Sequence, residues 1–330
     1  MVKLKTMTEI KYDVIGKSIT GASHTKSNLP NQDSVACFGD TTNGKDFVFG
    51  IVSDGHGSKK CFRSHLGSSF ATEVLSEIFT LFAESIKEDT NQQSVKQYVV
   101  DEFPKMIVES WREKVNEHLE NYPYSNEDLQ VLSITKADFN SPKFSKAKYL
   151  PYGATLLGVL LLKKFVVYVQ LGDGDILIAT EEGEVFRRLK EDDRLLGNET
   201  TSLCLETAQN DFRTAIDFIV ETPPHFILIS TDGFANAYKE DVELFKFPAD
   251  VSKLHKEKGF NYLKQNLSDW LEETSVQASG DDTSMCIIVS NRVEVEIVIE
   301  PEQPKQPVEK GNWKKKIITS IGSFFKKNFS

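Results

Sequence analysis

The order of apolar patterns along the chain restricts its fold more than any other feature of the sequence. Runs typical of buried strands fill residues 12–53, and two long helical stripes follow, with apolar residues every four positions over 62–82 and 95–119. Strand-like runs then crowd together from residue 154 onward. A parallel α/β sheet requires strands and helices in regular alternation, which this order lacks. We therefore predict an α+β fold, in which antiparallel sheets form a sandwich with helices packed outside.

Periodicity and turn residues place the individual elements. Pro104 interrupts the second helical stripe and should kink or split that helix, because proline has no amide proton to donate. Residues 121–150 are polar and irregular, so we expect a long loop there. A helix is expected over 262–271, and strands are expected over 154–162, 165–171, 176–180, 184–189, 226–231, 285–290 and 293–299.

Charge and cysteine content exclude several classes of protein. A net charge of −10 argues against a nucleic-acid binder. The four Cys residues, at 37, 61, 204 and 286, have no CxxC spacing, which argues against a zinc site or a disulfide scaffold and fits a reducing cytoplasm. The N-terminus is too polar for a signal peptide, and no apolar run approaches the ~20 residues that a membrane span needs. We expect a cytoplasmic protein.

Aspartates recur at the ends of strongly apolar strands. A single Asp-Gly pair is a common turn, but Asp54-Gly55 is followed by a helix rather than by the second strand of a hairpin. In antiparallel sheets, strands that leave one edge lie beside strands that enter at that edge, so all of these ends can share one rim. The acids follow or precede strands at Asp33, Asp54, Asp173, Asp232, Asp281 and Asp282.

Clustered carboxylates repel one another and raise one another's pKa, a cost that a bound cation removes. The donors available at these strand ends are all oxygens, namely the carboxylates, the Gln32 amide and the carbonyls of Gly55 and Gly233. Hard oxygen ligands suit Mg²⁺ or Mn²⁺ better than Zn²⁺. Two such ions about 3.5–4 Å apart form the usual clamp for phosphoryl chemistry. The sequence therefore predicts a two-ion site at the rim.

Six short motifs in this order resemble the protein phosphatase 2C family of metal-dependent Ser/Thr phosphatases, and its bacterial branch in particular. They are P-N-Q-D (30–33), S-D-G-H-G (53–57), G-A-T-L (153–156), L-G-D-G-D (171–175), S-T-D-G-F (230–234) and G-D-D-T-S (280–284). The resemblance covers roughly residues 11–291. It implies two antiparallel β-sheets sandwiched between pairs of antiparallel α-helices.

The resemblance also implies roles for individual residues. Asp54 matches the carboxylate that bridges both ions, Gly55 the carbonyl ligand, and Asp232 and Asp281 the other carboxylates of the second ion. His56 matches a residue proposed as the general acid for the leaving group. Residues expected around the ions or their waters, without direct coordination, are Gln32, Asp33, Asp173 and Asp282.

Three positions depart from the family pattern. Many members have an Arg where this chain has Asn28, so Lys26 or His24 becomes the candidate for binding substrate phosphate. The acid that many members use for a third ion is replaced by the Leu150-Pro151-Tyr152 region, which puts a third ion in doubt. The Ser-Arg pair of the usual G-D-S-R motif is Gly174-Asp175 here, for which the sequence offers no interpretation.

The resemblance implies a Ser/Thr protein phosphatase that hydrolyses phosphoserine and phosphothreonine with a hydroxide bridging two Mg²⁺ or Mn²⁺ ions. Its substrates would be phosphoproteins made by a cognate Ser/Thr kinase. The alternative is a weak or inactive phosphatase-like module that binds a partner without turnover. A Cys-dependent phosphatase is excluded, because the only Cys-x₅-Arg spacing, from Cys286 to Arg292, spans a strand with no Gly-rich phosphate loop.

Composition divides the chain into a catalytic domain over 1–299, a Pro/Gln/Glu linker over 300–309 and a basic tail over 310–330. The tail holds six Lys and no acidic residue. Drawn as a helix, it places Trp313, Ile317, Ile318, Ile321, Phe324 and Phe325 on one face. Such a segment has three possible binding sites. They are the anionic inner surface of the membrane, the groove of a partner protein, and its own domain.

Overall fold

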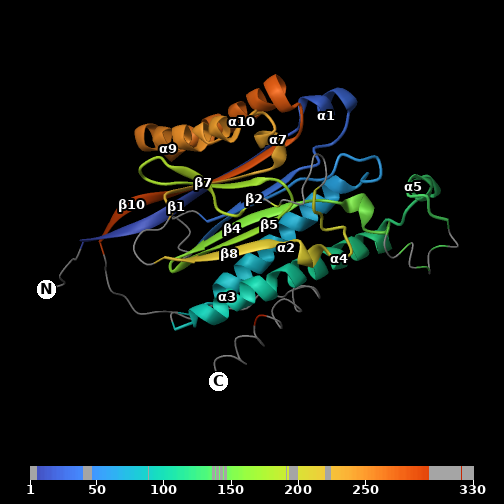
Figure 1. The fold of residues 1–330 in the computed structure, drawn as a ribbon, viewed down its shortest axis with the longest axis horizontal. Coiled ribbons are helices and arrows are strands. Elements are labelled where there is room, and N and C mark those ends of the chain that lie inside the picture. Colours follow the sequence, from blue (N-terminus) through green and yellow to red (C-terminus); the bar gives the residue numbers. More distant parts are fainter. Residues whose placement is uncertain are drawn as a thin grey trace.

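Two five-stranded antiparallel sheets form the centre of the protein (Figure 1). In this computed structural model, the described residues are 6–39, 47–87, 89–135, 138, 141, 144, 147–190, 192, 200–219, 224–296 and 321. The first sheet has the strand order β1-β10-β9-β6-β7 and the second β2-β3-β4-β5-β8. The strands are β1 Thr6–Ile19, β2 Ser34–Phe38, β3 Phe47–Ser53, β4 Leu156–Leu162, β5 Phe165–Leu171, β6 Asp175–Ala179, β7 Val185–Arg187, β8 Arg213–Phe218, β9 Phe226–Ser230 and β10 Thr283–Glu296.

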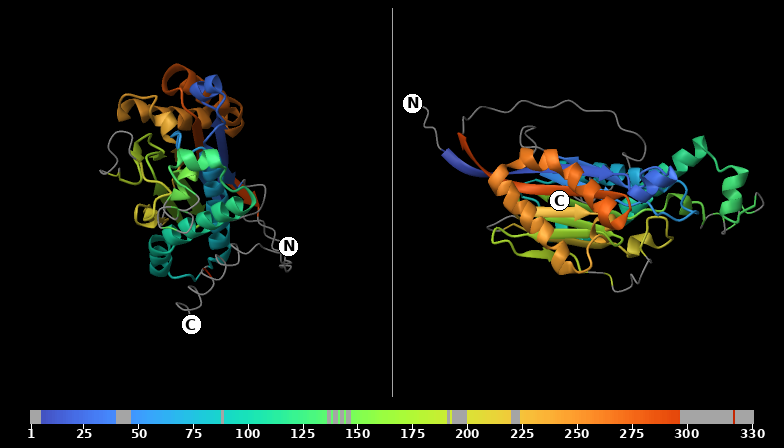
Figure 2. Two further views of the ribbon diagram at one scale, coloured as in Figure 1. Left: turned by 90° about the vertical axis from the view of Figure 1, so that its right-hand side faces the viewer. Right: turned by 90° about the horizontal axis from the view of Figure 1, so that it is seen from above.

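Helices cover the outer face of each sheet, and Figure 2 shows the same layers from two other sides. Helices α2, α3 and α4 pack on the second sheet, and α9 and α10 pack on the first. Their bounds are α1 Ala22–Ser27, α2 Ser64–Ser85, α3 Gln92–Asp101, α4 Phe103–Asn121, α5 Asn126–Val131, α7 Asp232–Ala235, α8 Asp241–Leu244, α9 Lys246–Lys258 and α10 Phe260–Thr274. The predicted α+β sandwich is confirmed.

Burial on both faces explains why the central strands are apolar at nearly every position. In β4, Leu156 and Leu160 pack against the helices of the second sheet, whereas Leu157 and Val159 pack between the two sheets. In β9, Leu228 likewise packs under the helices of the first sheet. Successive side chains of a strand point to opposite faces, so a strand covered on both sides must be apolar throughout.

Most predicted elements are present, with some differences in their bounds. The second helical stripe is split at Glu102 into α3 and α4, with Pro104 in the first turn of α4, where its missing amide proton costs nothing. The expected loop over 121–150 contains helix α5, which begins with a capping box between Ser125 and Asp128. The two strands expected after residue 284 are one long strand, β10. Sequence periodicity missed β8, α7, α8 and α9, and it also missed α1, which lies inside the run over 12–53 that was predicted as strands.

Most of the proposed linker and tail lies outside the described residues. Within the tail the structure describes Ile321, which is helical, 3% exposed and part of the apolar cluster shared by α2, α3, α4 and the second sheet. Among the described residues, no helix is long and apolar enough to cross a membrane.

Candidate metal and phosphate site

The loop after β3 carries the Asp54 motif and is fixed to the start of β4. The backbone amide of Asp54 donates to Thr155 Oγ1 at 3.0 Å, and the amide of Thr155 donates to the Asp54 carbonyl at 2.8 Å. Ser53 Oγ donates to the Thr155 carbonyl at 2.6 Å. The G-A-T motif therefore holds the Asp54 loop in place. The sequence alone did not predict this role.

Glycine follows Asp54, Asp173 and Asp232, and at Gly55 and Gly233 neighbouring backbone of another rim loop comes too close for a side chain. A Cβ atom on Gly55 would lie 2.5 Å from the Gln32 carbonyl oxygen, and one on Gly233 would lie 2.0 Å from the Asp282 carbonyl oxygen. Both distances are far inside van der Waals contact. The two glycines thus let the loops of the rim approach one another, in addition to leaving their own carbonyls accessible.

The acids beside β2, β9 and β10 are placed by neighbouring hydroxyl and amide groups. Thr231 Oγ1 donates to Asp33 Oδ2 at 2.8 Å, and Asn236 Nδ2 donates to Asp232 Oδ2 at 3.0 Å. Asp281 follows a π-helical turn that ends at Gly280 with a φ of 72°, and Ser275 Oγ donates to its carbonyl at 3.0 Å. Asn236 could have been found in the sequence as the i+4 neighbour of Asp232 on a helix.

Electrostatics show that these carboxylates lie close together. We call Asp33, Asp54, Asp173, Asp232 and Asp281 the acid rim. Burial, followed by the charges of Asp33, Asp232 and Asp281, raises the pKa of Asp54 well above its usual value, and Asp54 and Asp232 are near enough to hydrogen-bond through a shared proton. Burial raises the pKa of Asp33 to about 8. Burial and then Asp173 raise the pKa of Asp232 to about 6.

The donor set of the acid rim fits a hard divalent cation. Its side-chain donors are carboxylate oxygens that repel one another, and a cation would remove that cost. Gln32 adds a buried Oε1 that has no hydrogen-bond partner among the described residues, while its Nε2 donates to Ser64 Oγ at 2.7 Å. In the described part of the chain, however, no three His, Cys, Asp or Glu side chains stand in an arrangement that could already hold a metal ion. The rim supplies the right donors without a formed coordination sphere.

Comparison with known proteins identifies the family. The sequence profile of protein phosphatase 2C matches residues 20–272 of this chain. The chain belongs to the protein phosphatase 2C family. No curated protein matches the sequence.

Two solved structures show the same fold at low sequence identity. A bacterial serine phosphatase is 13% identical with a TM-score of 0.51, covering 84% of this chain and 97% of that chain. A point variant of such a phosphatase is 14% identical with a TM-score of 0.50 over the same shares of the two chains. The catalytic domain of the serine threonine protein phosphatase PstP, in complex with 2 manganese ions, is 13% identical with a TM-score of 0.49, covering 86% of this chain and 99% of that chain.

His56 lies beside the acid rim, two residues after Asp54 in the S-D-G-H-G motif. Its amide donates to the Gly153 carbonyl at 3.0 Å, and a Cβ on Gly153 would lie 2.6 Å from His56 Cδ2, so the imidazole fits against a bare glycine. Burial lowers the pKa of His56, and the nearby Asp173 carboxylate opposes that shift. Asp173 accepts a hydrogen bond from Thr200 Oγ1 at 3.0 Å.

The two residues predicted to bind phosphate are placed differently from each other. His24 Nδ1 lies 2.8 Å from Asp282 Oδ2, and its Nε2 lies 3.8 Å from Asp281 Oδ1. Asp282 is buried and also accepts from the backbone amides of Gly21 and Gln32, at 2.7 and 2.6 Å. His24 is therefore tied to a carboxylate that organises the rim. Lys26 is exposed on α1, as is Asn28 at the end of that helix.

Two departures from the family pattern have a structural explanation. Tyr152, in the region without the third acid, is buried, and its hydroxyl lies 2.8 Å from both Arg63 Nη1 and His118 Nδ1. Asp175, in place of the usual Arg, is buried and accepts from Arg187 Nε at 2.6 Å. Arg187 also holds Asp241 on α8 through both of its Nη atoms, and we call Asp175, Arg187 and Asp241 the Arg187 corner. Sequence analysis had not singled out Arg187.

Proposed function

We propose that this chain is a metal-dependent serine/threonine protein phosphatase that uses two Mg²⁺ or Mn²⁺ ions. The observation that supports it most is the convergence of Asp33, Asp54 and Asp232, whose mutual proximity contributes to their raised pKa values. A fold in this family gains nothing for its own stability from such a cluster. The arrangement becomes favourable when cations bind it, which is the state that phosphoryl chemistry requires.

Each residue of the site then has a task. Asp54, Asp232, Asp281 and the Gly55 carbonyl would hold the ions, with Gln32 Oε1 near their bound water. When bound, the ions would neutralise charge on the phosphoryl group and make water a better nucleophile at neutral pH. His56 would protonate the leaving oxygen of the Ser or Thr side chain, with Asp173 favouring its charged form. Asp33 and Asp282 would orient the loops that carry the ligands.

Direct attack by water agrees with the state of the cysteines. Burial raises the pKa of Cys61 to about 11 and also raises the pKa of Cys204 and Cys286, so these thiols are protonated at neutral pH. A thiol is a poor nucleophile compared with a thiolate. None of these three cysteines is therefore in the state that a covalent cysteinyl-phosphate mechanism requires.

The experiment is a measurement of phosphate release from p-nitrophenyl phosphate and from a phosphothreonine peptide with Mn²⁺, with Mg²⁺ and with excess EDTA. We expect turnover of both substrates with the ions and none in EDTA. Equal turnover in EDTA contradicts the metal-dependent mechanism. Tight binding of the phosphopeptide with no turnover under any condition instead supports the alternative, a phosphatase-like binding module.

The binding partner of the proposed tail, 310–330, is a separate question from the catalytic activity. Burial of Ile321 in the apolar cluster of α2, α3 and α4 favours docking on its own domain over an anionic membrane surface or the groove of a partner. We propose that Ile321 anchors the tail there. Co-sedimentation with anionic and neutral vesicles compares the full chain with a chain ending at residue 299. Salt-sensitive binding of the full chain alone to anionic vesicles contradicts the proposal, whereas a lower Tm of the shortened chain supports it.

A further inference from the structure

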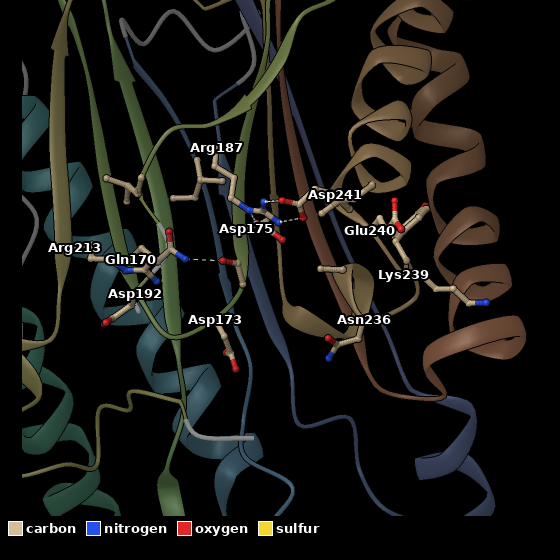
Figure 3. Close-up of a pocket in the computed structure, with 16 residues that line it drawn as sticks. Gln170, Asp173, Asp175, Arg187, Asp192, Arg213, Asn236, Lys239, Glu240 and Asp241 are labelled. Carbon is tan, nitrogen blue, oxygen red and sulfur yellow. Dashed lines mark hydrogen bonds and ion pairs between the residues drawn. The ribbon is translucent and has the colours of Figure 1, made fainter. Parts of the chain in front are cut away.

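A polar pocket of about 290 Å³ opens beside the acid rim (Figure 3). Its walls come from the end of β5, from β6 and β7, and from α7 and α8. It meets the acid rim at Asp173 and at Asn236, which donates to Asp232. A peptide whose phosphate group lay at the rim would therefore place the side chain of a neighbouring residue at this pocket.

Two of the three cations that line the pocket are engaged in holding it together. Arg187 donates from Nε to Asp175 and from both Nη atoms to Asp241. Arg213 donates from Nη1 to the Lys190 carbonyl at 2.6 Å and from Nη2 to the Gly172 carbonyl. These guanidinium groups thus tie β7 to α8, and β8 to the loop after β5. Their donors are directed to the walls of the pocket.

The lining of the pocket carries more negative than positive charge. Five acidic side chains, Asp173, Asp175, Asp192, Glu240 and Asp241, line it with three basic ones, of which the third is Lys239. In Figure 3 the side chain of Lys239 runs away from the other labelled residues. Apolar surface is also present, from Ile176, Leu189 and Leu244.

We propose, resting on the proposed function, that this pocket binds a Lys or Arg side chain of the phosphoprotein near the phosphorylated residue. The long alkyl part of such a side chain packs on apolar surface while its charged end reaches polar groups, as basic side chains do at protein surfaces. Glu240, which is exposed at the α8 side of the pocket, supplies the carboxylate for that charged end. An acidic side chain at the same place meets the same carboxylate and is repelled. The site is thereby selective for phosphoproteins with basic residues beside the phosphorylation site.

The test compares three phosphothreonine peptides that differ only at the flanking positions, which carry Arg, Ala or Glu. The full chain with Mn²⁺ should show kcat/KM in the order Arg, Ala, Glu, with a gain of about fivefold for each exposed ion pair that forms. Glu240→Gln should reduce the Arg-over-Ala ratio, and Glu240→Lys should favour the Glu peptide. Glu272→Gln, an equal charge change on the exposed side of α10, should leave the ratio unchanged.

Outcomes for this proposal are separable from those for the phosphatase activity. Equal kcat/KM for the three peptides overturns the basic-residue pocket while the proposed function stands. A preference that persists in Glu240→Gln and Glu240→Lys also overturns it, because long-range charge rather than the pocket would then act. If no turnover occurs, fluorescence anisotropy of the labelled peptides with Mn²⁺ reads the same preference as an affinity, so the pocket is tested in that case too. Equal affinities in that case count against it.

Discussion

Two neighbouring groups of carboxylates in this protein differ in how their negative charge is compensated. In the Arg187 corner, Asp175 and Asp241 share one guanidinium, and hydrogen bonds from Arg187 lower the pKa of Asp241. In the acid rim, the carboxylates face one another, and the pKa values of Asp33, Asp54 and Asp232 are raised. Only a few residues, from Asp173 to Asp175, separate the two groups along the chain.

The contrast shows what an acidic residue at a strand end contributes. An acid with a nearby cation stabilises the fold, as Asp175 does by fixing β7 and α8 to the pocket wall. An acid among other acids destabilises the fold. A bound cation removes that cost, so the cluster can serve as a functional site. Substitutions in the acid rim should therefore act mainly on activity, and substitutions in the Arg187 corner mainly on stability.

Asp54→Asn should abolish Mn²⁺-dependent turnover, because the carboxylate in contact with most of the rim loses its charge. Asp232→Asn and Asp281→Asn should each cost at least about 10²-fold in kcat. Metal-free Asp54→Asn should be no less stable than the parent, since one repulsive charge is gone. The control is Asp250→Asn on the exposed side of α9. Full activity of Asp54→Asn would show that the rim is not the site.

His56→Ala should slow hydrolysis of a phosphothreonine peptide by about 10²-fold, the lower range for a lost general acid. It should affect p-nitrophenyl phosphate much less, because p-nitrophenolate leaves without a proton. Parallel measurements of kcat on both substrates test this. Equal losses would make His56 a residue that shapes the rim rather than a proton donor.

The metal-free protein should become less stable as the pH rises from about 4 towards 8. The pKa of Asp33 is about 8 in the folded protein and 3.8 in the unfolded chain. The folded protein therefore binds more protons than the unfolded chain in this range, and raising the pH favours unfolding. Urea unfolding in EDTA at pH 5.5 and pH 8 measures the slope, which is at most about 1.4 kcal/mol per pH unit for one group. Asp33→Asn should reduce the slope, with the raised pKa values of Asp54 and Asp232 accounting for the rest. An unchanged slope in that variant would remove Asp33 from the explanation.

Arg187→Met should lower the free energy of unfolding by about 2 kcal/mol, less than for a fully buried pair because Arg187 is partly exposed. The cost arises because Asp175 is left buried and unpaired. Arg188→Met is the matched control, since its partner Asp217 is 41% exposed, and it should cost about 1 kcal/mol or less. Asp175→Asn combined with Arg187→Met should recover part of the loss. Equal costs for Arg187→Met and Arg188→Met would contradict the special role of the corner.

Local sequence was enough to predict the fold class and most of the elements. The apolar runs of β4, β5 and β9 are continuous because these strands are buried on both faces, and the four-residue stripes of α2 and α4 are visible because each helix buries one face. Motif order was enough to predict the family and to bring Asp33, Asp54, Asp232 and Asp281 to one rim. Short or polar elements such as α7, α8 and β8 were missed, because their periodicity is too brief to read.

The tertiary structure alone decided which charge meets which. Asp175 and Arg187 are twelve residues apart on neighbouring strands, and Asp241 reaches the same guanidinium from a helix 54 residues further along the chain. His24 looked available for phosphate in the sequence, yet it is tied to Asp282, 258 residues away. Coulombic and hydrogen-bond energies depend on distance in space, and strand pairing sets that distance. The sequence by itself therefore determined which acids reach the rim, and the packing of the two sheets decided which of them have a cation.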